Sequence, residues 1–96
     1  MILAGDVGGT KTLLALVEPI GRSLRVVAEA RYESGKHRGL EPIVEAFLRD
    51  ERARPERAVF GVAGPVIGGR AELTNLDWKL DRSLLAPAVG LEIALV

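Results

Sequence analysis

The stretch Gly5–Thr12, GDVGGTKT, decides how this chain begins to fold and what it can bind. Three glycines within five positions let the backbone turn tightly and bring N–H groups close to an anion, because glycine has no Cβ. Asp6 adds a carboxylate, which would repel a phosphate unless a cation lay between the two. The stretch therefore predicts a site for a metal-bound nucleotide. An ordinary glycine-rich hairpin turn is the alternative.

The segments on either side show which kind of loop this is. Ile2–Val7 and Thr12–Glu18 are short apolar runs, which predict two strands joined as an antiparallel hairpin. A P-loop, GxxxxGK[ST], joins a strand to a helix. Here Thr10 stands where that pattern needs glycine, and a strand-like run follows Lys11. The dinucleotide fingerprint GxGxxG fails on spacing and on context. The prediction is a phosphate loop within a hairpin.

The following residues predict a third strand and an amphipathic helix. From Leu40 to Leu48 the apolar residues recur with the helical period, and Pro55 is expected to end this helix. Ser23–Glu33 alternates apolar and charged side chains, which predicts a half-buried strand. Its expected buried face consists of Leu24, Val26, Ala28, Ala30 and Tyr32.

The rest of the chain predicts the second half of the same sheet. Ala58–Gly64 is apolar on both faces, as in a buried parallel strand, so the helix must cross over the sheet. Ala71–Asn75 predicts a short hairpin extension. Asp81 is expected to cap a helix that buries Leu84 and Leu85, and the closing residues LEIALV predict a final strand. The predicted fold is a mixed α/β sheet in the order β-β-β-α-β, a hairpin extension, then α-β.

Composition limits the classes of function. Thirteen basic and thirteen acidic side chains balance, and no helical face concentrates Lys and Arg, so nucleic acid is not an expected partner. The chain has no cysteine, which excludes disulfides and thiolate chemistry and suits a cytoplasmic location. Asp6 interrupts the first apolar run, and we expect neither a signal peptide nor a membrane-spanning segment.

Three stretches resemble bacterial glucokinases: GDVGGTKT at Gly5, GVAGPVIGGR at Gly61 and LTNLDW at Leu73. They follow the order and spacing of that family and span most of the chain. The predicted element order also resembles the ribonuclease H-like domain of the actin-like ATPases and sugar kinases. The resemblance implies that residues 1–96 form the small N-terminal domain of such a kinase, truncated, without its large domain. The related ROK sugar kinases share the first stretch and fit the later two less well.

The resemblance implies ATP and Mg²⁺ as cofactors and glucose or a similar hexose as substrate. It places the hairpin at the ATP phosphates, with N–H groups from Gly8 and Gly9 and a hydroxyl from Thr10, and it implies that Asp6 holds Mg²⁺ through water. Lys11 either neutralises phosphate charge or is a solvated side chain, since many glucokinases have asparagine there. The expected nucleotide-binding residues are Gly5, Asp6, Val7, Gly8, Gly9, Thr10 and Lys11.

Among the remaining polar and aromatic residues, only one is a candidate for a functional role. Asn75 is a candidate for orienting the sugar or the loop beneath it, whereas Trp78 is expected in the core and His37 in solvent. Glu72 and Asp77 have no partner carboxylate for acid–base chemistry.

The resemblance implies that the catalytic aspartate follows Val96, in an Asn-Asp-Phe stretch, so we expect no catalytic residue in this chain. It also allows a homodimer for the intact protein. Two alternatives stay open: a ROK-type kinase of different sugar specificity, and a non-catalytic, truncated module that binds a nucleotide.

Overall fold

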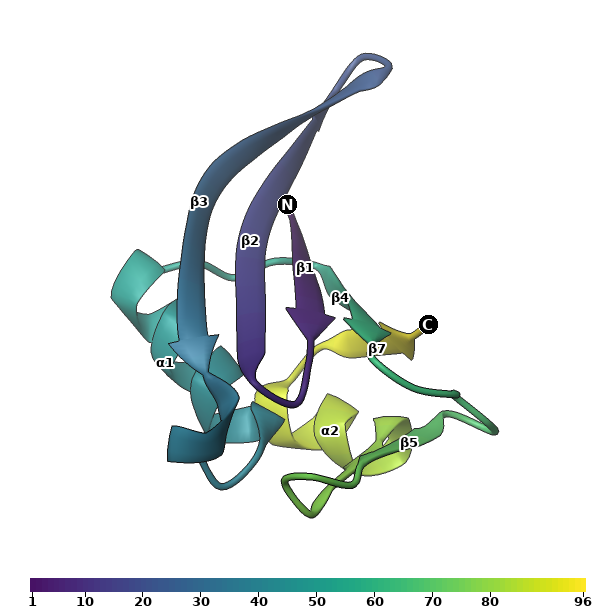
Figure 1. Cartoon of the computed structure of the whole chain (residues 1–96). Helices are drawn as coiled ribbons and strands as arrows, with labels where there is room; N and C mark the ends of the chain where they lie inside the picture. Colours follow the sequence, from purple (N-terminus) through teal and green to yellow (C-terminus); the bar gives the residue numbers. More distant parts are fainter.

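The chain forms a five-stranded mixed sheet with two helices and a separate two-stranded hairpin (Figure 1). The computed structural model describes all 96 residues. Strand order in the large sheet is β3-β2-β1-β4-β7, and β5 pairs with β6. The elements are β1 Ile2–Val7, β2 Lys11–Ile20, β3 Ser23–Glu33, the 3-10 turn η1 Ser34–Lys36, α1 Leu40–Glu51, β4 Arg57–Val62, β5 Arg70–Leu73, β6 Trp78–Asp81, α2 Arg82–Val89 and β7 Glu92–Leu95. The predicted fold class and element order are confirmed.

The pairing register divides the large sheet into two faces. β1 runs antiparallel to β2 and parallel to β4, so Leu3, Leu16 and Ala58 lie on one face. This inner face carries most of the buried core and packs on the apolar sides of α1 and α2. The opposite face, which we call the outer face, carries Ala4 and Asp6 of β1, Leu13 and Ala15 of β2, Glu29 and Arg31 of β3, and Val59 of β4. No helix covers the outer face.

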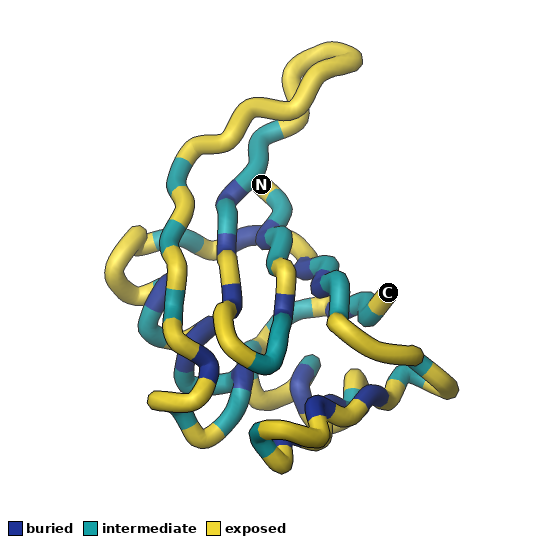
Figure 2. Tube along the Cα trace, viewed as in Figure 1, coloured by how far each residue is buried: buried dark blue, intermediate teal, exposed yellow.

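The distal part of the β2–β3 hairpin projects beyond the body of the molecule (Figures 1 and 2). Leu24 is 70% exposed and Val26 55% exposed, so the predicted buried face of β3 is wrong in this half. Alternation predicts which side chains share a face, but burial requires a second layer, and no helix lies under this arm. A register shift between Leu16 and Val17 also interrupts the pairing there. Ala28, Ala30 and Tyr32 do pack against the core.

Helix α1 follows the predicted apolar stripe but ends before Pro55. Leu40, Ile43 and Phe47 are buried, as their spacing requires. The helix stops at Glu51 because Arg52 adopts a left-handed conformation, φ 52°, from which its N–H reaches the carbonyls of the last turn. Proline is therefore not what terminates this helix.

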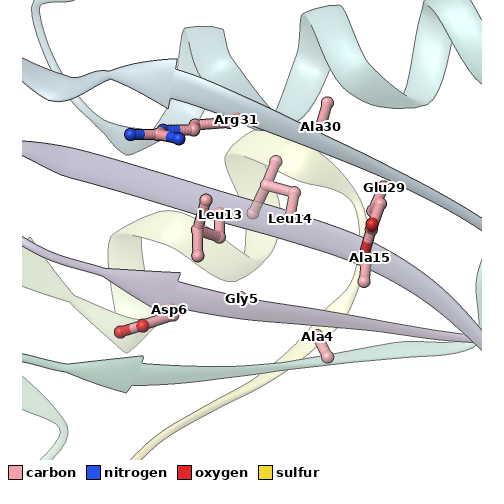
Figure 3. A pocket seen from close by; sticks show the side chains of 9 residues that line it. All are labelled: Ala4, Gly5, Asp6, Leu13, Leu14, Ala15, Glu29, Ala30 and Arg31. Carbon is pink, nitrogen blue, oxygen red and sulfur yellow. The ribbon is translucent and has the colours of Figure 1, made fainter. Parts of the chain in front are cut away.

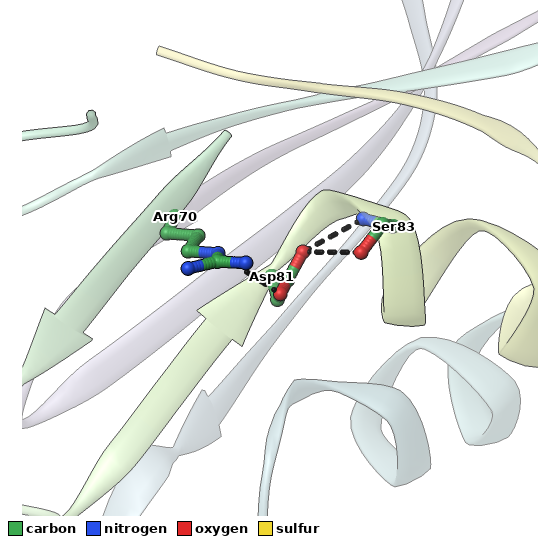
Figure 4. A network of polar contacts seen from close by, with 3 residues as sticks. All are labelled: Arg70, Asp81 and Ser83. Atoms are coloured by element: carbon green, nitrogen blue, oxygen red, sulfur yellow. Dashed lines mark hydrogen bonds and ion pairs between the residues drawn. The ribbon is translucent and has the colours of Figure 1, made fainter. Parts of the chain in front are cut away.

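Helix α2 begins as predicted, at the Asp81 cap. The Asp81 carboxylate accepts hydrogen bonds from the Ser83 N–H and hydroxyl at 2.9 and 2.7 Å, and it pairs with Arg70 at 3.3 Å (Figure 4). Leu85 is buried, but Leu84 is 70% exposed, so the predicted burial of Leu84 is wrong. α2 is only two turns long and faces the sheet with a single side. Neither helix has the length and hydropathy that a bilayer crossing requires.

Candidate functional site

The loop Gly8–Thr10 joins β1 to β2, which confirms a hairpin rather than a strand-to-helix phosphate loop. The Gly8 N–H donates to the Lys11 carbonyl at 3.0 Å and closes the turn. The N–H groups of Gly9 and Thr10 find no acceptor within the chain. Of the two glycines expected to present N–H groups, only Gly9 does so in this geometry, and Thr10 supplies the second free donor.

All three carbonyls of this loop accept hydrogen bonds from residues elsewhere in the chain. Ser34 Oγ donates to the Gly8 carbonyl at 2.7 Å, and the Ser34 N–H donates to the Thr10 carbonyl at 3.0 Å. Asn75 Nδ2 donates to the Gly9 carbonyl at 3.2 Å. In a trans peptide the N–H points opposite to the C=O. The Gly9 N–H therefore points away from Ser34 Oγ, and the Thr10 N–H points away from the Asn75 amide.

Ser34 and Thr12 form a buried polar pair beneath the loop. Both residues are fully buried, and their hydroxyl oxygens lie 2.8 Å apart. Because Ser34 gives its single hydroxyl proton to the Gly8 carbonyl, Thr12 must be the donor to Ser34 Oγ. Sequence reasoning missed both roles. No local pattern reports them, because Ser34 lies 22 residues from Thr12.

The three glycines are required by close approach and not by a left-handed turn, since none of them has positive φ. A Cβ on Gly5 would lie 2.5 Å from Phe60 Cδ1, and one on Gly9 would lie 2.3 Å from Asn75 Oδ1. A Cβ on Gly8 would lie 3.0 Å from the Lys11 carbonyl. Gly5 is therefore a core-packing residue within β1, whereas Gly9 makes room for the Asn75 side chain.

Asp6 lies in β1 and not in the loop, with its side chain on the exposed outer face. It forms no hydrogen bond or ion pair within the chain, and no group of three potential metal ligands surrounds it. Figure 3 shows Asp6 and Arg31 on either side of Leu13. These residues line an open hollow of about 630 Å³ that extends across β1, β2 and β3. The Asp6 carboxylate is thus free to act as one ligand among several from elsewhere.

A smaller hollow of about 320 Å³ lies at the tip of the loop, between Gly9–Lys11 and the η1 turn. Lys11 is exposed and forms no ion pair there. Lys36 Nζ lies 2.8 Å from Glu33 Oε2, and this hydrogen bond raises the pKa of Lys36 and lowers the pKa of Glu33. Lys11, which directly follows Thr10, is therefore an unpaired cation at this hollow, and Lys36 is a second lysine there that the sequence did not mark.

The β5–β6 hairpin packs against this loop region. Trp78 is 4% exposed, as predicted for a core residue, and its Nε1 donates to the His37 carbonyl at 3.3 Å. The His37 residue is half-buried, and its ring forms a T-shaped pair with Tyr32, with the ring centres 5.8 Å apart, so the expected solvated histidine is only partly correct. Glu72 and Asp77 are exposed and carry no hydrogen-bonded partner. Tertiary packing thus brings Asn75 to the loop, which was not predictable from their separation.

A family model described as glucokinase matches residues 3–96. Glucokinases from Trichormus variabilis and Nostoc sp. are each 45% identical over 94 residues, and that of Caulobacter vibrioides is 37% identical over 89. These matches cover 92–95% of this chain but only 27–28% of each relative. The chain therefore spans about a quarter of the length of the curated relatives.

Solved structures agree with this assignment. A glucokinase from an Antarctic psychrotroph superposes with a TM-score of 0.86 at 28% identity, over 98% of this chain and 31% of that one. A ROK family glucokinase from Streptomyces griseus, determined in complex with glucose and AMPPNP, gives a TM-score of 0.68 at 25% identity, over 98% of this chain and 32% of that one. The chain has the fold of the N-terminal third of actin-like sugar kinases and belongs to the glucokinase family.

Proposed function

We propose that residues 1–96 are the N-terminal domain of an ATP-dependent kinase that phosphorylates glucose to glucose 6-phosphate, and that this segment binds the ATP phosphates. The observation that carries the proposal is the pair of free N–H groups on Gly9 and Thr10. The carbonyls of the same two peptides accept hydrogen bonds from Ser34 and Asn75. Hydrogen-bond donors that the fold already holds in place can stabilise phosphate charge without a rearrangement of the loop. The proposed nucleotide segment remains Gly5–Lys11, with Gly5 and Gly8 as backbone supports.

Asp6 fits a water-mediated Mg²⁺ ligand. Its carboxylate is exposed and unpaired, and Mg²⁺ usually keeps several waters and takes only one or two carboxylates beside the phosphates. When bound, Mg²⁺ neutralises charge on the transferring phosphoryl group. The free ammonium of Lys11 would add positive charge on the neighbouring strand, at the tip of the loop.

Phosphoryl transfer to a sugar hydroxyl also needs a carboxylate that accepts the hydroxyl proton. No acidic residue in the chain combines burial, a polar partner and proximity to the Gly9–Thr10 donors. The resemblance to glucokinases implies that the catalytic base follows Val96, and we propose it there. Discrimination among hexoses, and thus the choice between glucose and another sugar of the ROK kinases, would also lie there.

The first experiment titrates the chain with AMPPNP, with and without Mg²⁺, by calorimetry. Asp6→Asn should weaken Mg·AMPPNP binding by about tenfold, which corresponds to one charge-assisted contact of roughly 1.5 kcal/mol. Binding of metal-free AMPPNP should be unchanged or improved. Glu29→Gln is the matched control because Glu29 carries the same charge on the same open face. Equal losses in the two variants would remove Asp6 from the site.

The second experiment measures glucose-dependent ADP production in a coupled assay. The 96-residue chain alone should show none. A chimera in which this chain replaces the matching N-terminal segment of the Nostoc sp. glucokinase should show turnover, and Asp6→Asn should reduce it. Turnover by the isolated chain would refute the assignment of the base to a later segment.

A second candidate is a non-catalytic module that only binds the nucleotide. The free N–H groups of Gly9 and Thr10 would serve this function as well as they serve the first. A monomer that unfolds cooperatively, is stabilised by Mg·ATP and gives an inactive chimera would support this candidate. An aggregated or molten chain would instead indicate a fragment that needs the rest of the kinase.

A further inference from the structure

We propose that Asn75 is a positioning residue of the phosphate loop: its side-chain amide holds the Gly9 carbonyl and thereby fixes the direction of the Thr10 N–H. The inference rests on the proposed nucleotide function of that loop. It assigns Asn75 to the nucleotide, through Gly9, and not to the sugar.

The contact is close and specific to glycine. Asn75 Nδ2 lies 3.2 Å from the Gly9 carbonyl, across 66 residues of sequence. The amide also occupies the space where a side chain at position 9 would begin, because a Cβ there would lie 2.3 Å from Oδ1 and 2.5 Å from Nδ2. The Asn75 amide therefore packs on the Gly9 backbone, and a larger residue at either position changes the contact.

The hairpin that carries Asn75 is itself anchored. The Leu76 N–H donates to the Leu73 carbonyl at 3.1 Å, and Asp77 adopts a left-handed conformation, φ 56°, which completes the turn. The buried indole of Trp78 donates to the His37 carbonyl and joins the hairpin to the segment after β3. Asn75 is thus presented from a turn whose position the core determines.

The orientation of the Gly9–Thr10 peptide is held by Asn75 alone. Ser34 holds the carbonyls on both sides, those of Gly8 and Thr10. The Gly9 carbonyl has no donor other than Asn75. Without it, this peptide can rotate between its two supported neighbours. Rotation would change the direction of the Thr10 N–H, and the proposed phosphate site would lose one of its two donors.

The test compares Asn75→Ala with Thr74→Ala in the 96-residue chain. Thr74 is the adjacent exposed residue and forms no hydrogen bond. Asn75→Ala should weaken Mg·AMPPNP binding by about three- to tenfold, as expected for loss of one aligned donor. Thr74→Ala should change it less than twofold. In ¹⁵N spectra the Thr10 amide should shift on ligand addition in the wild type, and the shift should shrink in Asn75→Ala only.

A double-mutant cycle tests the contact independently of any ligand. Gly9→Ala should lower the urea midpoint in the wild type by about as much as Asn75→Ala does, because its Cβ displaces the exposed Asn75 amide and breaks the hydrogen bond to the Gly9 carbonyl. The same substitution should have a much smaller effect in the Asn75→Ala background. Equal midpoint shifts in both backgrounds would overturn the proposal.

The two proposals fail in different ways. If the wild-type chain binds no Mg·AMPPNP, the proposed function fails, and the double-mutant cycle, which needs no ligand, still decides the contact. If the wild type binds but Asn75→Ala binds equally well, the positioning role is refuted. Weaker glucose use by an Asn75→Ala chimera with unchanged ATP kinetics would assign Asn75 to the sugar instead.

Discussion

Removal of the Ser34 hydroxyl should destabilise the protein more than removal of its partner hydroxyl on Thr12. Both residues are fully buried, with Ser34 Oγ 2.7 Å from the Gly8 carbonyl and 2.8 Å from Thr12 Oγ1. Ser34→Ala leaves the Gly8 carbonyl without a donor and the Thr12 hydroxyl without an acceptor. Thr12→Val, which keeps the side-chain shape, leaves the bond from Ser34 to Gly8 intact.

The expected costs follow from that asymmetry. Each polar group left unpaired in the interior costs about 1–3 kcal/mol, so Ser34→Ala should lower the free energy of unfolding by about 3 kcal/mol. Thr12→Val should cost about 1 kcal/mol, because it removes one hydrogen bond and strands no donor. The double variant should be more stable than Ser34→Ala alone by about 1 kcal/mol, since the unpaired Thr12 hydroxyl is then gone.

Urea unfolding followed by the fluorescence of Trp78, the single tryptophan, measures these differences. With a slope of about 1.5 kcal/mol per molar urea, Ser34→Ala should lower the midpoint by about 2 M. Ser23→Ala is the control, because Ser23 is exposed at the start of β3. The reasoning is refuted if Thr12→Val costs as much as Ser34→Ala, or if the double variant is no more stable than Ser34→Ala.

Three further outcomes are expected from urea or thermal unfolding. Gly5→Ala should destabilise by about 1–3 kcal/mol through overpacking against Phe60, and by less in a Phe60→Leu background; equal costs would contradict the packing role. Arg52→Gly should stabilise by roughly 0.5–1 kcal/mol by relieving the left-handed conformation, whereas Arg52→Ala should not. Hydrogen bonds from Ser83 lower the pKa of Asp81 below its unfolded value. Its contribution to stability is therefore present above the unfolded pKa and lost as pH falls through the folded pKa, and Asp81→Asn should flatten that part of the profile of Tm against pH.

The elements of the fold were predictable because their signals are local. The apolar stripe from Leu40 to Leu48 reports the helical period directly, and the apolar run at Ala58–Gly64 contains strand β4, parallel to β1 as predicted. Only Ala58 and Phe60 of that run are fully buried, because no helix covers the outer face. The wrong predictions concern side chains whose burial requires another element packed over them. Leu24 and Leu84 satisfy the pattern for buried positions, yet neither has an element packed over it. The end of α1 was misplaced because a left-handed Arg52 carries no compositional signal.

Of the candidate site, only the glycine loop was predictable from the sequence. GDVGGTKT indicated a glycine hairpin between two strands, which is present, although Asp6 belongs to the strand; its binding of phosphate and Mg²⁺ stays a prediction. The pattern did not show that the Gly8 N–H closes the turn, so that the free donors are those of Gly9 and Thr10. It also could not show the buried hydroxyl pair beneath the loop.

The amino-acid sequence by itself determined the family, the order of the elements and the location of the glycine hairpin, because these depend on residue types at short spacing. Tertiary structure alone decided which N–H groups of that loop are free, since their direction depends on hydrogen bonds to the adjoining carbonyls. Those bonds come from Ser34 and Asn75, 26 and 66 residues away along the chain. Contacts over such separations form only when the sheet and the β5–β6 hairpin pack together, so no local pattern specifies them.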